Sequence, residues 1–227
     1  MPLVNQTRLI IALDLESFDK NVKIAKDCAQ YCDSFKISWP ALVYGFLEGK
    51  GNLVREVKKA TGKHVIVDWK VADVPHTNEK ITEMAVRMGA DGITFHGFMG
   101  QDAAQPVFDV GSSHQTDVYL VVQLSNPGAE KNMAPLLTQM CEMAKKTAAN
   151  GVIIPGTRPD LIKKVRELVG KECHILCPGM GAQGGKPGDA IRAGADFEIV
   201  GRSVIEAEYP PKAAYDIAME IRKAQGF

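Results

Sequence analysis

A short charged run, Asp68-Trp69-Lys70-Val71-Ala72-Asp73, holds the residues of this chain best suited to chemistry. It begins at the end of the apolar segment 64–67, which is typical of a buried strand, so carboxylates and an ammonium are placed where that strand ends. Burying a charged group costs free energy, so such a group is expected to be paired with an opposite charge or to have a function. Asp68 and Lys70 are two residues apart and would face the same way on an extended chain. A solvated charge cluster is the alternative interpretation, because a D-x-K-x-x-D pattern is short enough to recur by chance.

Eight short apolar runs, separated by amphipathic helical patterns, must position these groups. We expect strands at residues 8–14, 34–38, 64–70, 92–96, 117–124, 151–155, 174–177 and 197–200. Helices are expected at 21–31, 53–60, 78–88, 136–148, 161–169 and 213–224. Most of the strand runs are continuously apolar, as is typical of parallel strands covered on both faces. The pattern predicts an α/β fold, a (β/α)8 TIM barrel, with residues 1–227 as a single domain. An open doubly wound sheet is the alternative, but no Gly-x-Gly-x-x-Gly follows the first run.

Polar residues recur at the predicted strand ends, which meet at the carboxyl-terminal face of such a barrel. They include Asp14, Lys36, Asp68, Lys70, His96, Ser125 and Arg202. This convergence favours a catalytic site over a structural cluster. Asp73 follows a turn and could serve this site or a neighbouring one. His96 could act as an acid or base, although a hydrogen-bonded structural histidine is the favoured interpretation.

The last two loops have the composition of a phosphate site. One contains Pro178-Gly179-Met180-Gly181-Ala182-Gln183-Gly184-Gly185, and the other Gly201-Arg202-Ser203. Glycines let backbone N–H groups approach an anion, and Arg202 offers a bidentate guanidinium. A plain flexible turn is the alternative for the glycine loop. The segment Ser125-Asn126-Pro127-Gly128-Ala129-Glu130 predicts a turn that folds over the ligand as a lid, or else an ordinary exposed loop.

Composition narrows the class of partner. Lys plus Arg equals Asp plus Glu at 27 each, so no global basic field attracts nucleic acid. No segment approaches the ~20 consecutive apolar residues that cross a membrane, and the first residues do not have the pattern of a signal peptide. Five cysteines without zinc-type spacing are typical of reduced thiols. We therefore expect a cytoplasmic protein with no structural metal.

In these motifs the chain resembles the orotidine 5′-monophosphate decarboxylases of the compact single-domain kind. The resemblance covers nearly the whole length and is carried by several segments in order: Ile11-Ala12-Leu13-Asp14, Phe35-Lys36-Ile37, Asp68 to Pro75, Thr77-Asn78-Glu79-Lys80, His96-Gly97, Ser125 to Glu130, Pro178 to Gly185, and Val200-Gly201-Arg202-Ser203. Together they are far more specific than the D-x-K-x-x-D pattern alone.

The resemblance implies a lyase of pyrimidine biosynthesis that converts orotidine 5′-monophosphate to UMP and CO2 without metal or organic cofactor. It implies an alternating charge array of Lys36, Asp68, Lys70 and Asp73, in which Asp73 reaches into the site of a second subunit and Thr77 accompanies it across a homodimer interface. Asp14 would bind a ribose hydroxyl and Ser125 the pyrimidine. Gln183 and Arg202 would hold the phosphate, with Pro178 and Gly201 as further substrate-binding positions.

Two other functions stay open at this point. Sugar-phosphate decarboxylases and aldolases of the same superfamily share the barrel and the D-x-K-x-x-D pattern but use Mg²⁺. They typically carry an acidic metal ligand on the second strand, where this chain has Lys36. A non-catalytic phosphate-binding barrel is the other alternative, and the complete charge array argues against it.

Overall fold

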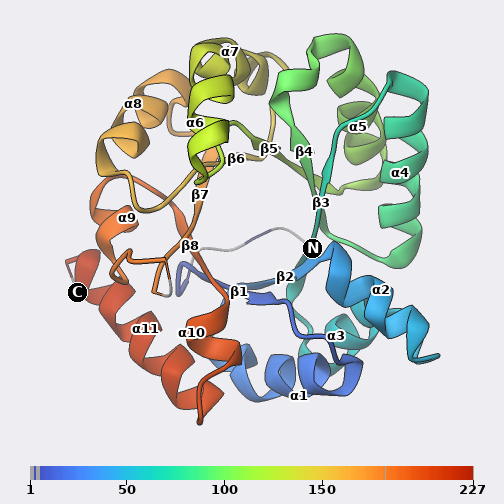
Figure 1. Cartoon of the computed structure of the whole chain (residues 1–227), viewed down its shortest axis with the longest axis vertical. Coiled ribbons are helices and arrows are strands. Elements are labelled where there is room, and N and C mark those ends of the chain that lie inside the picture. The colour runs from blue at the N-terminus through green and yellow to red at the C-terminus, as the bar shows by residue number, and fades with distance from the viewer. Residues whose placement is uncertain (1–2, 4–5, 182, 227) are drawn as a thin grey trace.

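The computed structural model describes residues 3, 6–181 and 183–226, and within them eight parallel strands close into a barrel (Figure 1). The strands follow one another around the barrel in sequence order, and the eighth pairs with the first. They are β1 (Leu9–Leu13), β2 (Ser34–Ser38), β3 (His64–Val71), β4 (Gly92–His96), β5 (Asp117–Val121), β6 (Gly151–Ile153), β7 (His174–Pro178) and β8 (Phe197–Val200). This closure confirms the predicted (β/α)8 barrel and excludes the open doubly wound sheet.

Helices form a layer outside the strands (Figure 1). The α-helices of the described residues are α1 (Phe18–Cys28), α2 (Trp39–Leu47), α3 (Leu53–Thr61), α4 (Pro75–Met88), α5 (Gln101–His114), α6 (Pro127–Met133), α7 (Leu137–Lys146), α8 (Pro159–Val169), α9 (Asp189–Arg192), α10 (Arg202–Ile205) and α11 (Pro210–Ala224). Single 3-10 turns occur at Ala29–Tyr31, Gly97–Met99 and Ala134–Leu136. The sequence patterns predicted α1, α3, α4, α7, α8 and α11 but not the others.

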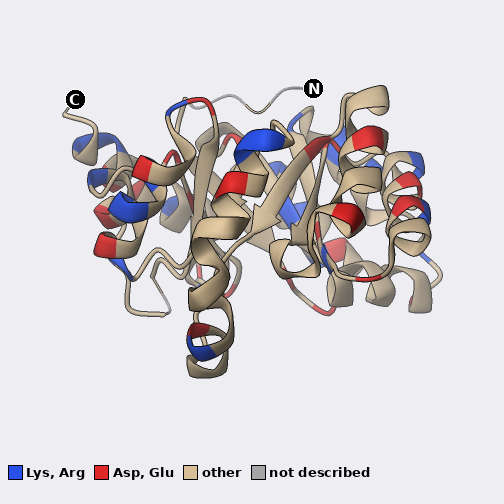
Figure 2. Ribbon diagram, turned by 90° about the horizontal axis from the view of Figure 1, so that it is seen from above, with Lys and Arg blue, Asp and Glu red and all other residues tan. Residues whose placement is uncertain are grey.

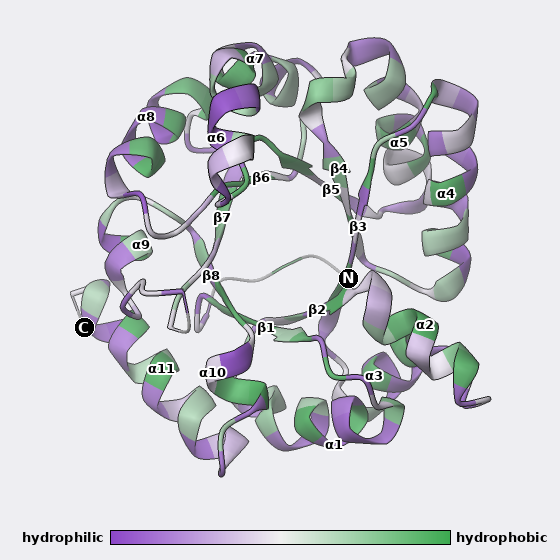
Figure 3. Cartoon of the chain, in the orientation of Figure 1, coloured by the Kyte–Doolittle hydropathy of each residue, from purple (hydrophilic) through white to green (hydrophobic). Residues whose placement is uncertain are grey.

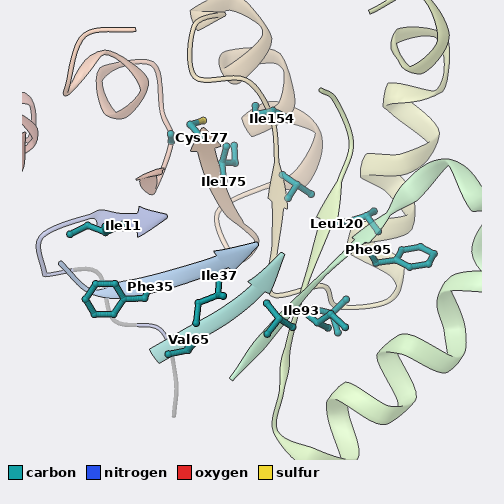
Figure 4. Packing of buried hydrophobic residues seen from close by; sticks show 14 of the residues in the cluster. Ile11, Phe35, Ile37, Val65, Ile93, Phe95, Leu120, Ile154, Ile175 and Cys177 are labelled. Atoms are coloured by element: carbon teal, nitrogen blue, oxygen red, sulfur yellow. The ribbon is translucent and has the colours of Figure 1, made fainter. Parts of the chain in front are cut away.

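Strand residues alternate between two apolar layers, and this alternation decides which side chains reach the site. One layer lies between the strands and the helices and includes Ile11, Ile37, Val65 and Phe95 (Figure 4). The other fills the barrel and consists of Ile10, Ala12, Ile66, Tyr119, Val121, Ile153, Leu176, Phe197 and Ile199. Figure 3 shows the hydrophobic colour concentrated on the strands and on parts of the helices. Lys36 is two residues after Ser34, and Asp68 is two residues after the inward-facing Ile66. Both side chains therefore point into the barrel, and their charges lie at its mouth.

Charged residues lie mainly on the outer helices, with acidic and basic positions interspersed (Figure 2). In the residues that the structure describes, no helix is both long and apolar enough to cross a membrane. All five cysteines are buried free thiols.

Candidate active site

Two lysines and one aspartate form a hydrogen-bonded charge network at the mouth of the barrel. Lys36 Nζ donates to Asp68 Oδ2 at 2.6 Å, and Lys70 Nζ donates to Asp68 Oδ1 at 2.9 Å. The side chains of Lys36 and Asp68 are each 9% exposed, whereas that of Lys70 is 40% exposed. Asp68 therefore holds two ammonium groups, of which only that of Lys70 is open to an incoming molecule.

The network keeps its members charged despite their burial. Burial disfavours the charge on Lys36, but Asp68 and Asp14 outweigh it and raise the Lys36 pKa above its ordinary value. Burial also disfavours the charge on Asp68, but Lys36 and Lys70 outweigh it and lower the pKa of its carboxyl well below its usual range. The site thus presents fixed charges at neutral pH.

Lys70 lies in a backbone irregularity that the sequence pattern did not predict. Val67 pairs with Ile93 and Val71 with Phe95, so three residues of β3 stand opposite the single residue Thr94 of β4. Lys70 itself has a φ of 48°, a left-handed conformation that is uncommon for a residue with a Cβ. The expectation that Asp68 and Lys70 point the same way is met by their contact, but the premise of a regularly extended strand was wrong. A strained residue of this kind costs about 1–3 kcal/mol and is found disproportionately at functional sites.

A cavity of about 240 Å³ opens above the charge network. The predicted site residues that line it are Asp14, Lys36, Asp68, Lys70, Pro178, Gln183, Gly201 and Arg202. Its apolar wall comprises Ala12, Val121, Leu124, Ile153, Met180 and Ile199. The cavity therefore combines charged and apolar lining residues, as a flat heterocycle carrying polar substituents would require.

The glycine loop and Arg202 both line this cavity, and Gly181 of the loop lies against Ser203, the residue after Arg202. Gly181 N donates to Gly185 O at 2.6 Å, which folds the loop back on itself, whereas Ala182 lies outside the described residues. A Cβ on Gly181 would collide with Ser203 Oγ, and the φ of Gly181 is +79°, so this position needs glycine. Arg202 is exposed and takes part in none of the ion pairs found among the described residues. Its guanidinium is available to an anionic group.

Three predicted site residues do not line the cavity of the single chain. Asp73 is exposed, and its Oδ1 accepts from Val74 N at 2.7 Å; no ion pair joins it to the Lys36–Asp68–Lys70 network among the described residues. Thr77 is half-buried on α4, and Ser125 is exposed just before α6. Asp73 instead lines a neighbouring hollow of about 290 Å³. That hollow is also lined by Trp39, Trp69, Lys70, Ile81 and Met84.

The segment predicted as a turn contains a helix. Pro127 starts α6, because a proline at the first helical position needs no N–H partner. In Figure 1, α6 overlies the barrel near β6 and β7, and Figure 2 shows a helix at this position projecting from the body. Glu130 of α6 is joined to Arg158 by an ion pair of 2.8 Å between partly exposed side chains. An exposed pair of this kind holds a segment only weakly, and the predicted role of this segment as a lid stays a prediction.

Two polar residues of β4 contact or approach the network. Thr94 is fully buried, and its hydroxyl donates to Asp68 Oδ1 at 3.0 Å. The sequence contained a signal for Thr94, because it is a polar residue between the apolar Ile93 and Phe95, at a strand position that points into the barrel. The expectation that His96 is hydrogen-bonded was wrong for Nδ1, which is buried without a partner among the described residues. Burial and the nearby Lys70 lower the pKa of His96 to about 4, so it is neutral at pH 7.

The donor set does not suit a divalent cation. No group of three or more His, Cys, Asp or Glu side chains is arranged as a metal site in the described part of the chain. The buried carboxylate of the site, Asp68, is already paired with two ammonium groups, which would repel a metal cation.

A family model described as "Orotidine 5'-phosphate decarboxylase / HUMPS family" matches residues 7–217. A curated relative from Pyrococcus furiosus is 38% identical over 216 residues, which cover 95% of this chain and 98% of the relative. Another from Pyrococcus abyssi is 40% identical over 214 residues, covering 94% and 99%. Both are named orotidine 5′-phosphate decarboxylase.

Solved structures are similar over the same extent. The orotidine 5′-monophosphate decarboxylase of Methanocaldococcus jannaschii, complexed with the inhibitor BMP, has a TM-score of 0.87 and 35% identity, covering 94% of this chain and 97% of that one. The Pyrococcus horikoshii orotidine 5′-phosphate decarboxylase has a TM-score of 0.85 and 38% identity, covering 94% and 99%. The likeness therefore extends through the whole barrel.

Proposed function

The chain belongs to the orotidine 5′-phosphate decarboxylase / HUMPS family, and from this premise we propose that it decarboxylates orotidine 5′-monophosphate to UMP and CO2. The observation that carries the proposal is the Lys36–Asp68–Lys70 network, which faces one cavity together with Arg202, a residue without an ion pair in the described part of the chain. The fixed ammonium of Lys70 suits the ring carbon that loses CO2. The separate guanidinium of Arg202 suits the phosphate that anchors the substrate.

Lys70 has the central chemical role in this proposal. When the bond between the pyrimidine C6 and its carboxyl group breaks, CO2 leaves and the electron pair stays on C6, with no electron sink in the ring. The ammonium of Lys70 stabilises that pair and then transfers a proton to C6, after which solvent reprotonates the amine. Lys36 keeps Asp68 ionised and in place, and Asp68 orients Lys70 through the 2.9 Å contact.

Repulsion between Asp68 and the substrate carboxylate is a smaller contribution. One charge pair at ~4 Å contributes about 4 kcal/mol at an effective dielectric constant of about 20. Enzymes typically lower the barrier by about 8–23 kcal/mol. Binding of the remote phosphate must therefore help to organise the site, as expected when binding energy of non-reacting groups is used at the reacting centre.

The remaining cavity residues divide between the two ends of the nucleotide. We assign Gln183 and Arg202 to the phosphate, with Pro178 and Gly201 shaping that end of the cavity. Asp14 is exposed at the end of β1 and lines the same cavity, which supports its assignment to a ribose hydroxyl. Ser125 would reach the pyrimidine when α6 moves over the cavity.

A homodimer would complete the charge array. Asp73 lies outside the cavity of its own chain and beside a hollow whose walls include Trp39, 53% exposed, and Met84, 52% exposed. Exposed apolar surface of this kind is typical of interaction sites. A second copy seated there would cover these side chains, and the proposal places Asp73 and Thr77 of each copy at the other's cavity.

The proposal includes catalysis without metal or organic cofactor and a cytoplasmic location. The position of Lys36 supports the first, because Mg²⁺-dependent members of the superfamily would need an acidic ligand there. The free thiols of all five cysteines support the second.

The decisive experiment mixes purified protein with orotidine 5′-monophosphate, with and without EDTA, and follows UMP formation. We expect equal rates in both samples. A parallel sample contains a ketose phosphate with Mg²⁺. Turnover of the sugar phosphate that EDTA abolishes, without UMP formation from the nucleotide, would replace the proposal with the metal-dependent alternative. Nucleotide binding without CO2 release would favour the non-catalytic barrel.

A further inference from the structure

Thr94 joins the backbone of Lys70 to the side chain of Asp68 through a single buried oxygen. Its Oγ1 accepts from the backbone N–H of Lys70 at 2.8 Å and donates to Asp68 Oδ1 at 3.0 Å. Thr94 is fully buried, so its hydroxyl cannot exchange these partners for solvent. The side chain uses its one proton and one of its lone pairs on the two residues that matter most to the proposed reaction.

The backbone irregularity explains why a hydroxyl is needed at this position. Three residues of β3 stand opposite Thr94 alone, so the ladder between β3 and β4 is interrupted there. Extra residues in a strand are left without ladder partners. The Lys70 N–H, in a left-handed residue with a φ of 48°, finds its acceptor in the Thr94 side chain instead. The hydroxyl thus supports the conformation from which the Lys70 side chain leaves the strand.

The same hydroxyl also acts on Asp68. Oδ1 of Asp68 accepts from both Lys70 Nζ and Thr94 Oγ1, while Oδ2 accepts from Lys36. Two cations alone would leave the carboxylate free to turn with whichever lysine moves. The neutral donor on the rigid strand β4 fixes the carboxylate relative to the Lys70 backbone.

We propose that Thr94 is a positioning residue of the active site, which holds Asp68 and Lys70 in the geometry required for decarboxylation. This inference rests on the proposed function. Thr94 itself does not line the cavity, so its effect is on the placement of Lys70 rather than on substrate affinity. Misplacement of a reacting group by ~1 Å can cost about 10²-fold in rate.

The test compares Thr94→Val, which keeps the shape and removes the hydroxyl, with Thr94→Ser, which keeps the hydroxyl. We expect Thr94→Val to lower kcat about 10- to 100-fold with KM changed less than about threefold, and Thr94→Ser to stay within about fivefold of the parent kcat. Thr147→Val is the matched control, because the Thr147 hydroxyl donates to Met143 O at 2.8 Å just ahead of β6, at the opposite end of the barrel. It should leave kcat unchanged.

A second measurement is independent of turnover. Hydrogen exchange of the Lys70 amide should be at least about tenfold faster in Thr94→Val than in the parent, and protected in Thr94→Ser. If Thr94→Val does not fold, Thr94→Ala replaces it in both measurements. Parent-like kcat without the hydroxyl, an effect confined to KM, or a serine variant as slow as the valine variant would overturn the inference. An inactive parent protein would instead reject the proposed function, and the exchange measurement would still decide whether Thr94 holds the Lys70 backbone.

Discussion

Replacing Lys70 with alanine should abolish turnover while leaving the fold and the phosphate end of the site intact. The lost ammonium would act on charge that develops at ~4 Å, where one pair contributes about 4 kcal/mol at an effective dielectric constant of about 20. That contribution corresponds to about 10³-fold in rate. Loss of a positioned general acid removes a further 10²- to 10⁴-fold, approximately. We therefore expect kcat to fall by about 10⁵-fold or more.

The structure indicates that this variant will fold. Asp68 keeps Lys36 at 2.6 Å and Thr94 at 3.0 Å, so its buried carboxylate is not left without partners. Arg202 lines the cavity but takes no part in the Lys36–Asp68–Lys70 network, so UMP should still bind in calorimetry, and phosphate-free uridine should bind much more weakly.

Lys58→Ala is the matched control for this variant. Lys58 is 34% exposed and pairs with Asp91 at 2.9 Å, close to the 40% exposure and 2.9 Å distance of the Lys70–Asp68 pair, but it lies on α3 outside the cavity. A stopped assay that follows UMP by chromatography should show parent-like kcat for Lys58→Ala. Turnover of Lys70→Ala within tenfold of the parent would refute the assignment of Lys70.

Three further predictions follow from the same geometry. Arg202→Ala should weaken nucleotide binding about 10²- to 10⁴-fold, because two charge-assisted hydrogen bonds are lost, but should barely change nucleoside binding; equal losses in calorimetry would argue against a phosphate contact. The pKa of His96 is lowered from 6.5 to about 4 by burial and Lys70, so the unfolded chain binds a proton that the folded chain does not. Stability should therefore fall as pH drops from 6.5 to about 4, by up to about 3 kcal/mol for this group, and urea unfolding of His96→Gln should show a flatter dependence; an unchanged slope would contradict the shift. Finally, mixing inactive Lys70→Ala and Asp73→Asn proteins should restore about a quarter of the parent activity, because half of the random dimers then hold one complete site of two; no recovery after subunit exchange would argue against a shared site.

The strands and the charge network could be predicted because local sequence determines them. Parallel strands covered on both faces are continuously apolar. A polar residue that points into the barrel or stands at the end of a strand is therefore conspicuous, as with Lys36 and Asp68. The closed barrel then follows from the number of βα units. These arguments use only the order of residues and the alternation of side chains along a strand.

Other features depend on tertiary contacts or on ambiguous signals. The helix α6 was predicted as a turn because Pro127 and Gly128 are typical of turns, although proline also starts helices. The left-handed Lys70 arises from the register between β3 and β4, which no local pattern encodes. The role of Thr94 depends on that register, because its hydroxyl can accept from the Lys70 N–H only where the ladder between β3 and β4 is interrupted. Asp73 lies outside the cavity of its own chain, so its assignment depends on a second copy.

The claim that a fixed ammonium at position 70 carries the chemistry can be tested most directly by rebuilding that group. All five native cysteines are buried, so Lys70→Cys would offer one accessible thiol to an alkylating reagent. We predict that Lys70→Cys is inactive, and that aminoethylation, which restores a side chain with a terminal ammonium of nearly the same length, returns UMP formation. Alkylation with iodoacetamide, which adds a neutral amide, should return none. Equal activity after the two treatments, or no recovery with the ammonium, would contradict the account.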